Sequence, residues 1–169
     1  MSIILGIDPG SHITGFGVVK NQGDQIVHVS HGIILLPKEQ ALPERLRVLS
    51  EEMREVLAKF EPDHVVIEKI FMGKSADSAF KLGHARGVVM SLAATSGAEV
   101  HEYASRLVKK AIAGKGSAEK TQVKRHVEVL LQLPEIDKLD ASDALALAIF
   151  HAQYSHSKKL LQRMREVSV

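Results

Sequence analysis

The sequence predicts an α/β fold in which a mixed five-stranded sheet is flanked by helices. Three apolar, β-branched runs come first, at 3–7, 15–20 and 25–36, and the turn "NQGD" joins the second to the third. From Pro43 onward the apolar period becomes helical, and helices then alternate with strands. An antiparallel meander followed by such alternation is typical of a mixed sheet covered by helices.

The later elements follow from local patterns. A stripe at helical spacing marks the first helix, and it comprises Leu46, Leu49, Met53, Val56, Leu57 and Phe60. "EPDH" ends this helix, and a short buried strand follows at 64–68. The segment 75–96, rich in Ala and Gly, predicts a second helix, and "AEVHEYA" predicts the fifth strand. Further helices are expected at 105–113, 118–132 and 141–155. We therefore expect one domain over 1–155 and a solvated C-terminal tail over 156–169.

The composition narrows the class of protein. A chain of 169 residues with 45% hydrophobic and 25% charged residues is ordinary for one globular domain. The absence of cysteine excludes disulfides, thiolate catalysis and Cys-based zinc sites. Neither a signal-peptide layout nor an apolar run of membrane-spanning length is present, so we expect a cytoplasmic location.

Positive charge is concentrated in one segment. The formal net charge is +2, but residues 106–126 hold seven Lys/Arg against the single acid Glu119, which leaves the rest of the chain net negative. Such a block suggests a phosphate-rich partner such as a nucleic acid. The alternative is a solvated helix face without a binding role.

Four carboxylates stand where burial is expected. Asp8 ends the first strand and Glu68 ends "VVIE", while Asp140 and Asp143 lie on one side of the first turn of the apolar helix "DASDALALAIF". Asp8 could instead stabilise the Pro-Gly turn, and Asp140 could cap the helix or complement its dipole.

If these carboxylates converge, they require protonation or a cation. Two of them about 4 Å apart repel by roughly 4 kcal/mol at an effective dielectric near 20. Oxygen donors favour Mg²⁺ or Mn²⁺ over zinc, and acidic clusters of this kind hold two ions in nucleases and polymerases. No histidine pair has helical metal-ligand spacing near the acids, so the nine histidines are interpreted as structural. His12 is the exception, because it is close to Asp8 in sequence and a role near the metal site stays open for it.

Four segments carry a family resemblance. "GIDPGSHITGFGVV", "VVIEKIFMGKSADSAFKLGHARG", "EYASRLVKKAIAGKGSAEKTQV" and "DASDALALA" resemble, in order and spacing, the bacterial RuvC family over residues 1–155. That resemblance implies a ribonuclease-H-like fold and a Holliday-junction endonuclease acting in recombination and DNA repair. It implies paired, Mg²⁺-dependent nicks in two opposed strands, with 5′-phosphate and 3′-hydroxyl ends. Mn²⁺ is expected to substitute for Mg²⁺.

The resemblance also implies roles for individual residues. The family's catalytic metal ligands correspond to Asp8, Glu68, Asp140 and Asp143, with two ions per site. Its DNA-binding positions correspond to Phe71, which would stack on bases at the crossover, and to Lys74, Lys109 and Lys120, which would contact phosphate. Core packing is the alternative for Phe71.

Partners and rival functions complete the expectations. A homodimer would supply two active sites for two opposed strands, and helix 75–96 would contribute to its interface or else pack on its own sheet. The resemblance adds the RuvA and RuvB branch-migration proteins as partners. One rival is an ATPase of the actin/hexokinase type, since Asp8, Gly10 and Gly15 also suit a phosphate loop. Another is a non-catalytic junction-binding protein.

Overall fold

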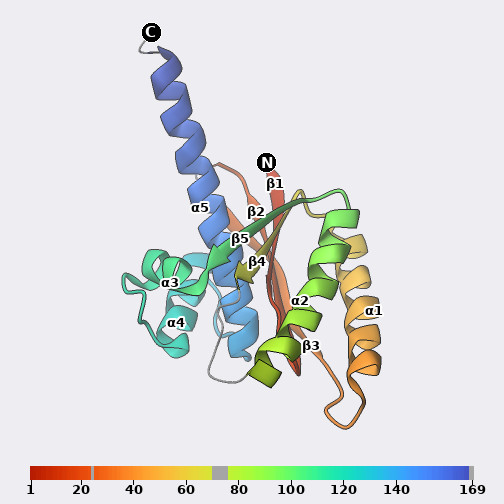
Figure 1. Ribbon diagram of the computed structural model, residues 1–169. Helices are drawn as coiled ribbons and strands as arrows, with labels where there is room; N and C mark the ends of the chain where they lie inside the picture. The colour runs from red at the N-terminus through yellow and green to blue at the C-terminus, as the bar shows by residue number, and fades with distance from the viewer. Residues whose placement is uncertain (24, 70–75, 168–169) are drawn as a thin grey trace.

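The computed structural model describes residues 1–23, 25–69 and 76–167, and the side chains in these ranges except those of 76–77 and 158–167. Its elements, in chain order, are β1 (Ser2–Asp8), β2 (Ile13–Asn21), β3 (Ile26–Leu35), α1 (Leu42–Phe60), β4 (His64–Lys69), α2 (Ala76–Thr95), β5 (Glu99–Ala104), α3 (Ser105–Ala113), α4 (Lys120–Leu131) and α5 (Leu139–Val167). Figure 1 shows the arrangement of these elements.

The strands form one mixed sheet in the order β3-β2-β1-β4-β5. β1 pairs antiparallel with β2, and β2 with β3, because short turns join them. β4 pairs parallel with β1 and β5 parallel with β4, because a helix crosses over before each of them. The predicted fold class is therefore confirmed, including the five strands and the antiparallel meander at the start of the chain.

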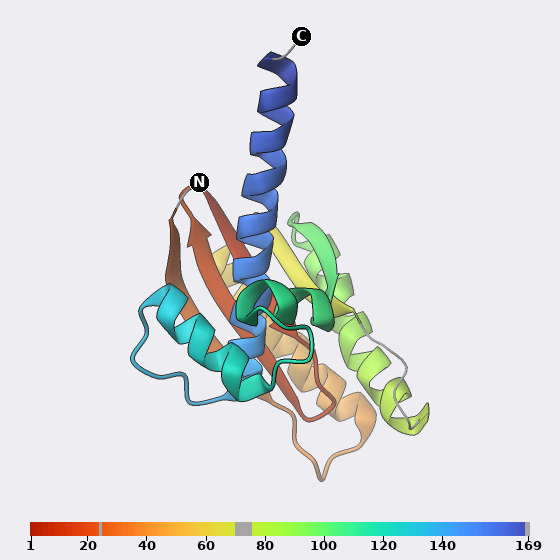
Figure 2. The same ribbon diagram turned by 90° about the vertical axis from the view of Figure 1, so that its left-hand side faces the viewer.

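Helices cover both faces of the sheet (Figures 1 and 2). α3, α4 and α5 share one apolar core with β1, β2 and β4, and that core includes Ile4, Val66 and Leu145. α1 and α2 share a second core on the opposite face, which includes Leu5 and Ile67. Successive residues of β1 thus enter different cores, as the alternation of side chains along a strand requires.

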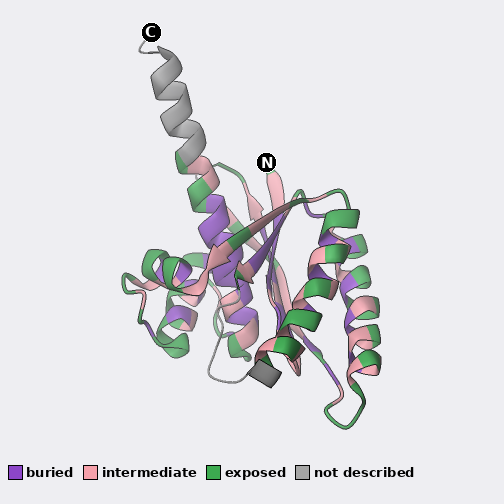
Figure 3. Ribbon diagram, viewed as in Figure 1, coloured by how far each residue is buried: buried purple, intermediate pink, exposed green. Residues whose placement is uncertain are grey.

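Burial is greatest where α5 crosses the sheet (Figure 3). Residues 144–152 of α5 are all buried, as expected for a helix that is apolar on nearly every face. The helix does not end at the predicted residue 155 but continues to Val167. No helix within the described ranges combines the length and apolar character that crossing a membrane requires.

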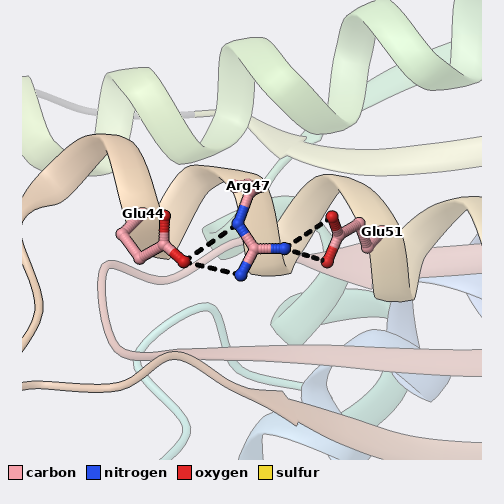
Figure 4. A network of polar contacts seen from close by, with 3 residues as sticks. All are labelled: Glu44, Arg47 and Glu51. Atoms are coloured by element: carbon pink, nitrogen blue, oxygen red, sulfur yellow. Dashed lines mark hydrogen bonds and ion pairs between the residues drawn. The ribbon is translucent and has the colours of Figure 1, made fainter.

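The outer face of α1 is held by exposed ion pairs (Figure 4). Arg47 donates from Nε and Nη2 to Oε1 of Glu44, at 2.9 and 2.6 Å, and from Nη1 to both oxygens of Glu51 at 2.6 Å. Pairs at this spacing favour the helix locally, but exposed charges contribute little to overall stability.

Two glycines of the sheet allow α5 to lie against it. A Cβ atom on Gly6 would lie 2.0 Å from the carbonyl oxygen of Ala144, and one on Gly15 would lie 2.0 Å from the carbonyl oxygen of Asp140. Any larger residue would push the helix away from the sheet. The glycines therefore set the distance between the acidic start of α5 and the strands beneath it.

Candidate active site

Strand register brings Asp8 and Glu68 together. β1 and β4 are parallel, and Ile7 pairs with Ile67, so each acid follows one residue later on its strand. Asp8 lies two residues beyond Gly6, and Glu68 two beyond Val66, both of which face α5. The two carboxylates consequently emerge side by side at the carboxyl ends of neighbouring strands, on the α5 face.

The start of α5 brings two further acids to the same edge. Asp8 pairs with Gly15 across β1 and β2, and the carbonyl oxygen of Asp140 packs against Gly15. Asp140 lies in the first turn of α5, with its side chain 34% exposed, while Asp143 one turn later is 15% exposed. Glu68 and Asp143 line one small pocket together. The predicted convergence of the four acids is thus present in the backbone arrangement.

The acids perturb one another electrostatically. Burial, then the charge of Glu68 and a hydrogen bond with its side chain, raise the pKa of Asp8 well above its usual value. Burial also raises the pKa of Asp143, although Lys120 acts in the opposite direction. The register that places Glu68 beside Asp8, together with the burial of Asp8, therefore favours a shared acidic site over a role confined to the Pro-Gly turn. Such shifts are characteristic of functional clusters of ionisable groups.

A lysine from α4 stands among these carboxylates. Lys120, the first residue of α4, places its Nζ 2.6 Å from Oδ2 of Asp143 and 3.7 Å from Oδ1 of Asp140. Burial lowers the pKa of Lys120, but the hydrogen bond and charge of Asp143 outweigh it and the pKa is raised. Lys109 lines the small pocket beside Glu68 and Asp143, and its charge also reaches Asp143. Both lysines therefore face the acids rather than a remote surface.

Two predicted site residues cannot be placed. Phe71 and Lys74 lie outside the described residues, between β4 and α2. Nδ1 of His12 lies 3.4 Å from Nη1 of the buried Arg45, so the His12 side chain contacts α1.

One residue at the edge of the site was not predicted. Arg86 of α2 donates from Nε to the backbone oxygen of Glu68 at 3.3 Å and forms an ion pair with Glu102 of β5. It therefore holds the end of β4 that carries Glu68. In the sequence it is one basic residue in a helix, and no local pattern connects it to a strand eighteen positions earlier.

Comparisons with known proteins agree with this arrangement. The family model described as "Crossover junction endodeoxyribonuclease RuvC" matches residues 4–151. A protein of that name from Bdellovibrio bacteriovorus is 53% identical over 161 residues, which cover 95% of this chain and 96% of the relative.

Solved structures give the same result. The structure of Thermus thermophilus RuvC matches with a TM-score of 0.82 at 32% identity, and the same protein in complex with a Holliday junction substrate matches with 0.83 at 30% identity. Each match covers 92% of this chain and 96% of the other. With the ribonuclease-H-like sheet and the acidic edge already described, these matches lead to one conclusion: the chain belongs to the RuvC family of crossover junction endodeoxyribonucleases.

Proposed function

We propose that the protein resolves Holliday junctions by metal-dependent nicks in two opposed strands, leaving 5′-phosphate and 3′-hydroxyl ends. The observation that carries the proposal is the meeting of Asp8 and Glu68 from parallel strands with Asp143 from α5. Burial first, and then the charge of Glu68, raise the pKa of Asp8, so holding these acids ionised and close together costs free energy. A cation bound among them would remove that cost.

The donor set suits magnesium. Asp8, Glu68, Asp140 and Asp143 offer only carboxylate oxygens, which hard divalent cations prefer, and Mn²⁺ would be the natural substitute. Four carboxylates are enough to hold two ions. When bound, such ions activate water as a nucleophile and stabilise the charge on the leaving oxygen.

The remaining site residues would act on the substrate. Lys109 and Lys120 present positive charge at the acids, where a scissile phosphate has to lie. In the hydrolysis, the oxygen of a water bonds to phosphorus and the bond between phosphorus and O3′ breaks. The proton from water leaves with the O3′ atom as a hydroxyl group. Phe71 and Lys74 are proposed to contact the bases and the backbone at the crossover.

A homodimer would provide two such sites, and α1 and α2 provide a suitable surface. These helices enclose an apolar groove of about 870 Å³, beside which Phe80 is 70% exposed. The small residues of α2 divide between two faces. Ala85 is buried against the sheet, whereas Gly83 and Gly87 have open space beside them. We propose that a second copy of the chain packs here, with RuvA and RuvB as further partners of the dimer.

The direct test uses a synthetic four-way junction with each strand labelled in turn. We expect Mg²⁺ to produce nicks at symmetric positions in two opposed strands, and ligase to seal the products without prior treatment. Asp8→Asn and Glu68→Gln should each lower the nicking rate by more than about 100-fold, because a ligand is lost. Glu52→Gln is a matched control on the exposed face of α1. Products that ligase cannot seal, or nicking in chelator, would contradict the proposal.

A further inference from the structure

A second cluster of ligand-type side chains lies away from the acids. His64 of β4, His101 of β5 and His151 of α5 come from three separate elements, and their ligand atoms lie within 4.8 Å of one another. Nδ1 of His64 is 3.2 Å from Nε2 of His101. The ring centroids of His101 and His151 are 4.1 Å apart. The three histidines are far apart in the sequence, so the cluster cannot be recognised there and forms only in the folded chain.

The register of the sheet explains why these rings meet. β4 and β5 are parallel, with His64 opposite Glu99 and Val66 opposite His101. Val66 faces the core beneath α5, so alternate residues along the two strands place both histidines on that same face. His151 descends onto them from α5, where it is 3% exposed.

Two neighbouring side chains, those of Glu99 and Tyr103, contact the histidine rings. The carboxylate oxygens of Glu99 lie 3.5 Å from Nδ1 of His64 and 3.4 Å from Nε2 of His101, and the Glu99 side chain is 68% exposed. The hydroxyl of Tyr103 lies 2.9 Å from Nδ1 of His151. A contact of this kind fixes the ring of a metal-binding histidine and sets which nitrogen coordinates.

We propose that His64, His101 and His151 form a binding site for a borderline transition-metal ion such as Zn²⁺, with Glu99 as the fourth ligand. Three imidazoles and one carboxylate are a donor set that zinc accepts in tetrahedral geometry. Ligands at zinc-nitrogen distances of about 2.0–2.1 Å stand roughly 3.4 Å apart around a tetrahedron. The spacing between His64 and His101 already approaches that value.

The site is separate from the acidic cluster. His151 follows Asp143 by eight residues on α5, which is about 12 Å along a helix axis. His64 precedes Glu68 by four residues at the opposite end of β4, about 13 Å along a strand. The two sites also differ in chemistry, because carboxylates select hard cations and imidazoles select softer ones. A bound ion here would tie α5 to β4 and β5.

A metal titration tests the inference. The chelator-treated protein is titrated with Zn²⁺ by calorimetry, and Co²⁺ is used as a spectroscopic probe of geometry. We expect the first equivalent of Zn²⁺ to bind at the histidines ahead of the acids, a tetrahedral spectrum for the first equivalent of Co²⁺, and a higher melting temperature with one equivalent of Zn²⁺ than with chelator. His64→Gln and His101→Gln should each weaken binding by more than about 100-fold, because each removes a ligand. Both side chains are 22% exposed, so the variants should fold.

Two controls separate this site from other zinc-binding positions. His28 and His31 form a two-histidine pair, with Nε2 and Nδ1 2.9 Å apart, so His28→Gln should leave Zn²⁺ binding intact. Asp8→Asn should also leave it intact, because the acids are elsewhere. Zn²⁺ binding that survives in His101→Gln, or that is lost in Asp8→Asn, would overturn the proposal. So would an octahedral spectrum for the first equivalent of Co²⁺, or the absence of a melting shift with one equivalent of Zn²⁺ in the unmodified protein.

Discussion

Nζ of Lys120 lies 2.6 Å from Oδ2 of Asp143, so α4 supplies a cation to the acids at the start of α5. The ammonium group lowers the pKa of Asp143, in opposition to burial and to the charge of Glu68, which both raise it. It also occupies space near the oxygens that would hold a metal ion. Lys120 and a divalent cation should therefore compete for the same carboxylates.

Removing this lysine should strengthen metal binding. We expect Lys120→Gln to raise the affinity for Mn²⁺ by about tenfold or more, equivalent to about 1.4 kcal/mol, because a competing positive charge is lost. Nicking should fall in the same variant if Lys120 also contacts phosphate. Calorimetry with Mn²⁺ measures the first effect, and Lys138→Gln is an exposed control near the start of α5. Weaker Mn²⁺ binding would instead show that Lys120 positions Asp143.

The raised pKa of Asp8 predicts a pH dependence of stability in chelator. The folded state binds this proton more tightly than the unfolded state does, where the pKa is about 3.9. The free energy of unfolding should therefore fall as the pH rises from about 4 through the folded-state pKa. Asp8→Asn should flatten this dependence and stabilise the metal-free protein at neutral pH. Urea unfolding across this range checks both effects, and an unchanged profile in Asp8→Asn would exclude Asp8 as their source.

Gly15 should tolerate no side chain. A Cβ atom there would lie 2.0 Å from the carbonyl oxygen of Asp140, so Gly15→Ala must displace the start of α5. We expect a loss of about 1–3 kcal/mol in stability and a clear loss of nicking. Gly83→Ala, which meets open space on α2, is the matched control for stability. Thermal melting and nicking assays together test this, and wild-type behaviour of Gly15→Ala would show that α5 can shift freely.

Salt dependence should reveal the lysines that reach DNA. The logarithm of junction affinity is expected to fall linearly with the logarithm of salt, by about 0.9 per phosphate contacted. Lys109→Gln should make this slope shallower by about one contact, whereas Lys59→Gln on α1 should leave it unchanged. Fluorescence anisotropy in Ca²⁺ provides the measurement. Equal slopes for the unmodified protein, Lys109→Gln and Lys59→Gln would indicate that the basic segment is a solvated helix face without a binding role.

The proposed dimer depends on the groove between α1 and α2. Phe80→Asp places a charge in this apolar surface and should shift sedimentation toward the monomer, since a desolvated charge opposes association. Val129→Asp is the control, because Val129 is an exposed apolar residue on α4, at 78% exposure. This substitution should leave the sedimentation unchanged. A monomeric unmodified protein, or dissociation by both substitutions, would place the interface elsewhere or exclude it.

Local patterns in the sequence were sufficient to predict the sheet and the edge at which the acids meet. Continuous apolar, β-branched runs assigned Asp8 and Glu68 to the ends of buried strands, and the nearly all-apolar sequence after Asp143 identified α5 as a buried helix. The end of α5 was misjudged because residues 156–169 were interpreted as a solvated tail. The following segment "KKLLQRMREV" is rich in good helix formers, and their propensity carries the helix to Val167.

Contacts between distant elements could not be predicted. The role of Gly15 depends on how closely α5 approaches β2, and the ion pair of Lys120 depends on how α4 packs beside α5. His64, His101 and His151 show no metal-ligand spacing in the chain. Only the parallel register of β4 and β5 beneath α5 places them together. Roles for Phe71 and Lys74 remain predictions, because both residues lie outside the described ranges.

The length of α5 has a practical consequence for handling the protein. Asp143 and Val167 are separated by about 36 Å of helix at 1.5 Å per residue, and the far end of α5 extends away from the sheet (Figures 1 and 2). A surface tether or fluorescent dye attached at that end would stand well clear of the acidic edge. Immobilised in this orientation, the protein would present the edge to incoming junctions, as single-molecule measurements of successive nicks require.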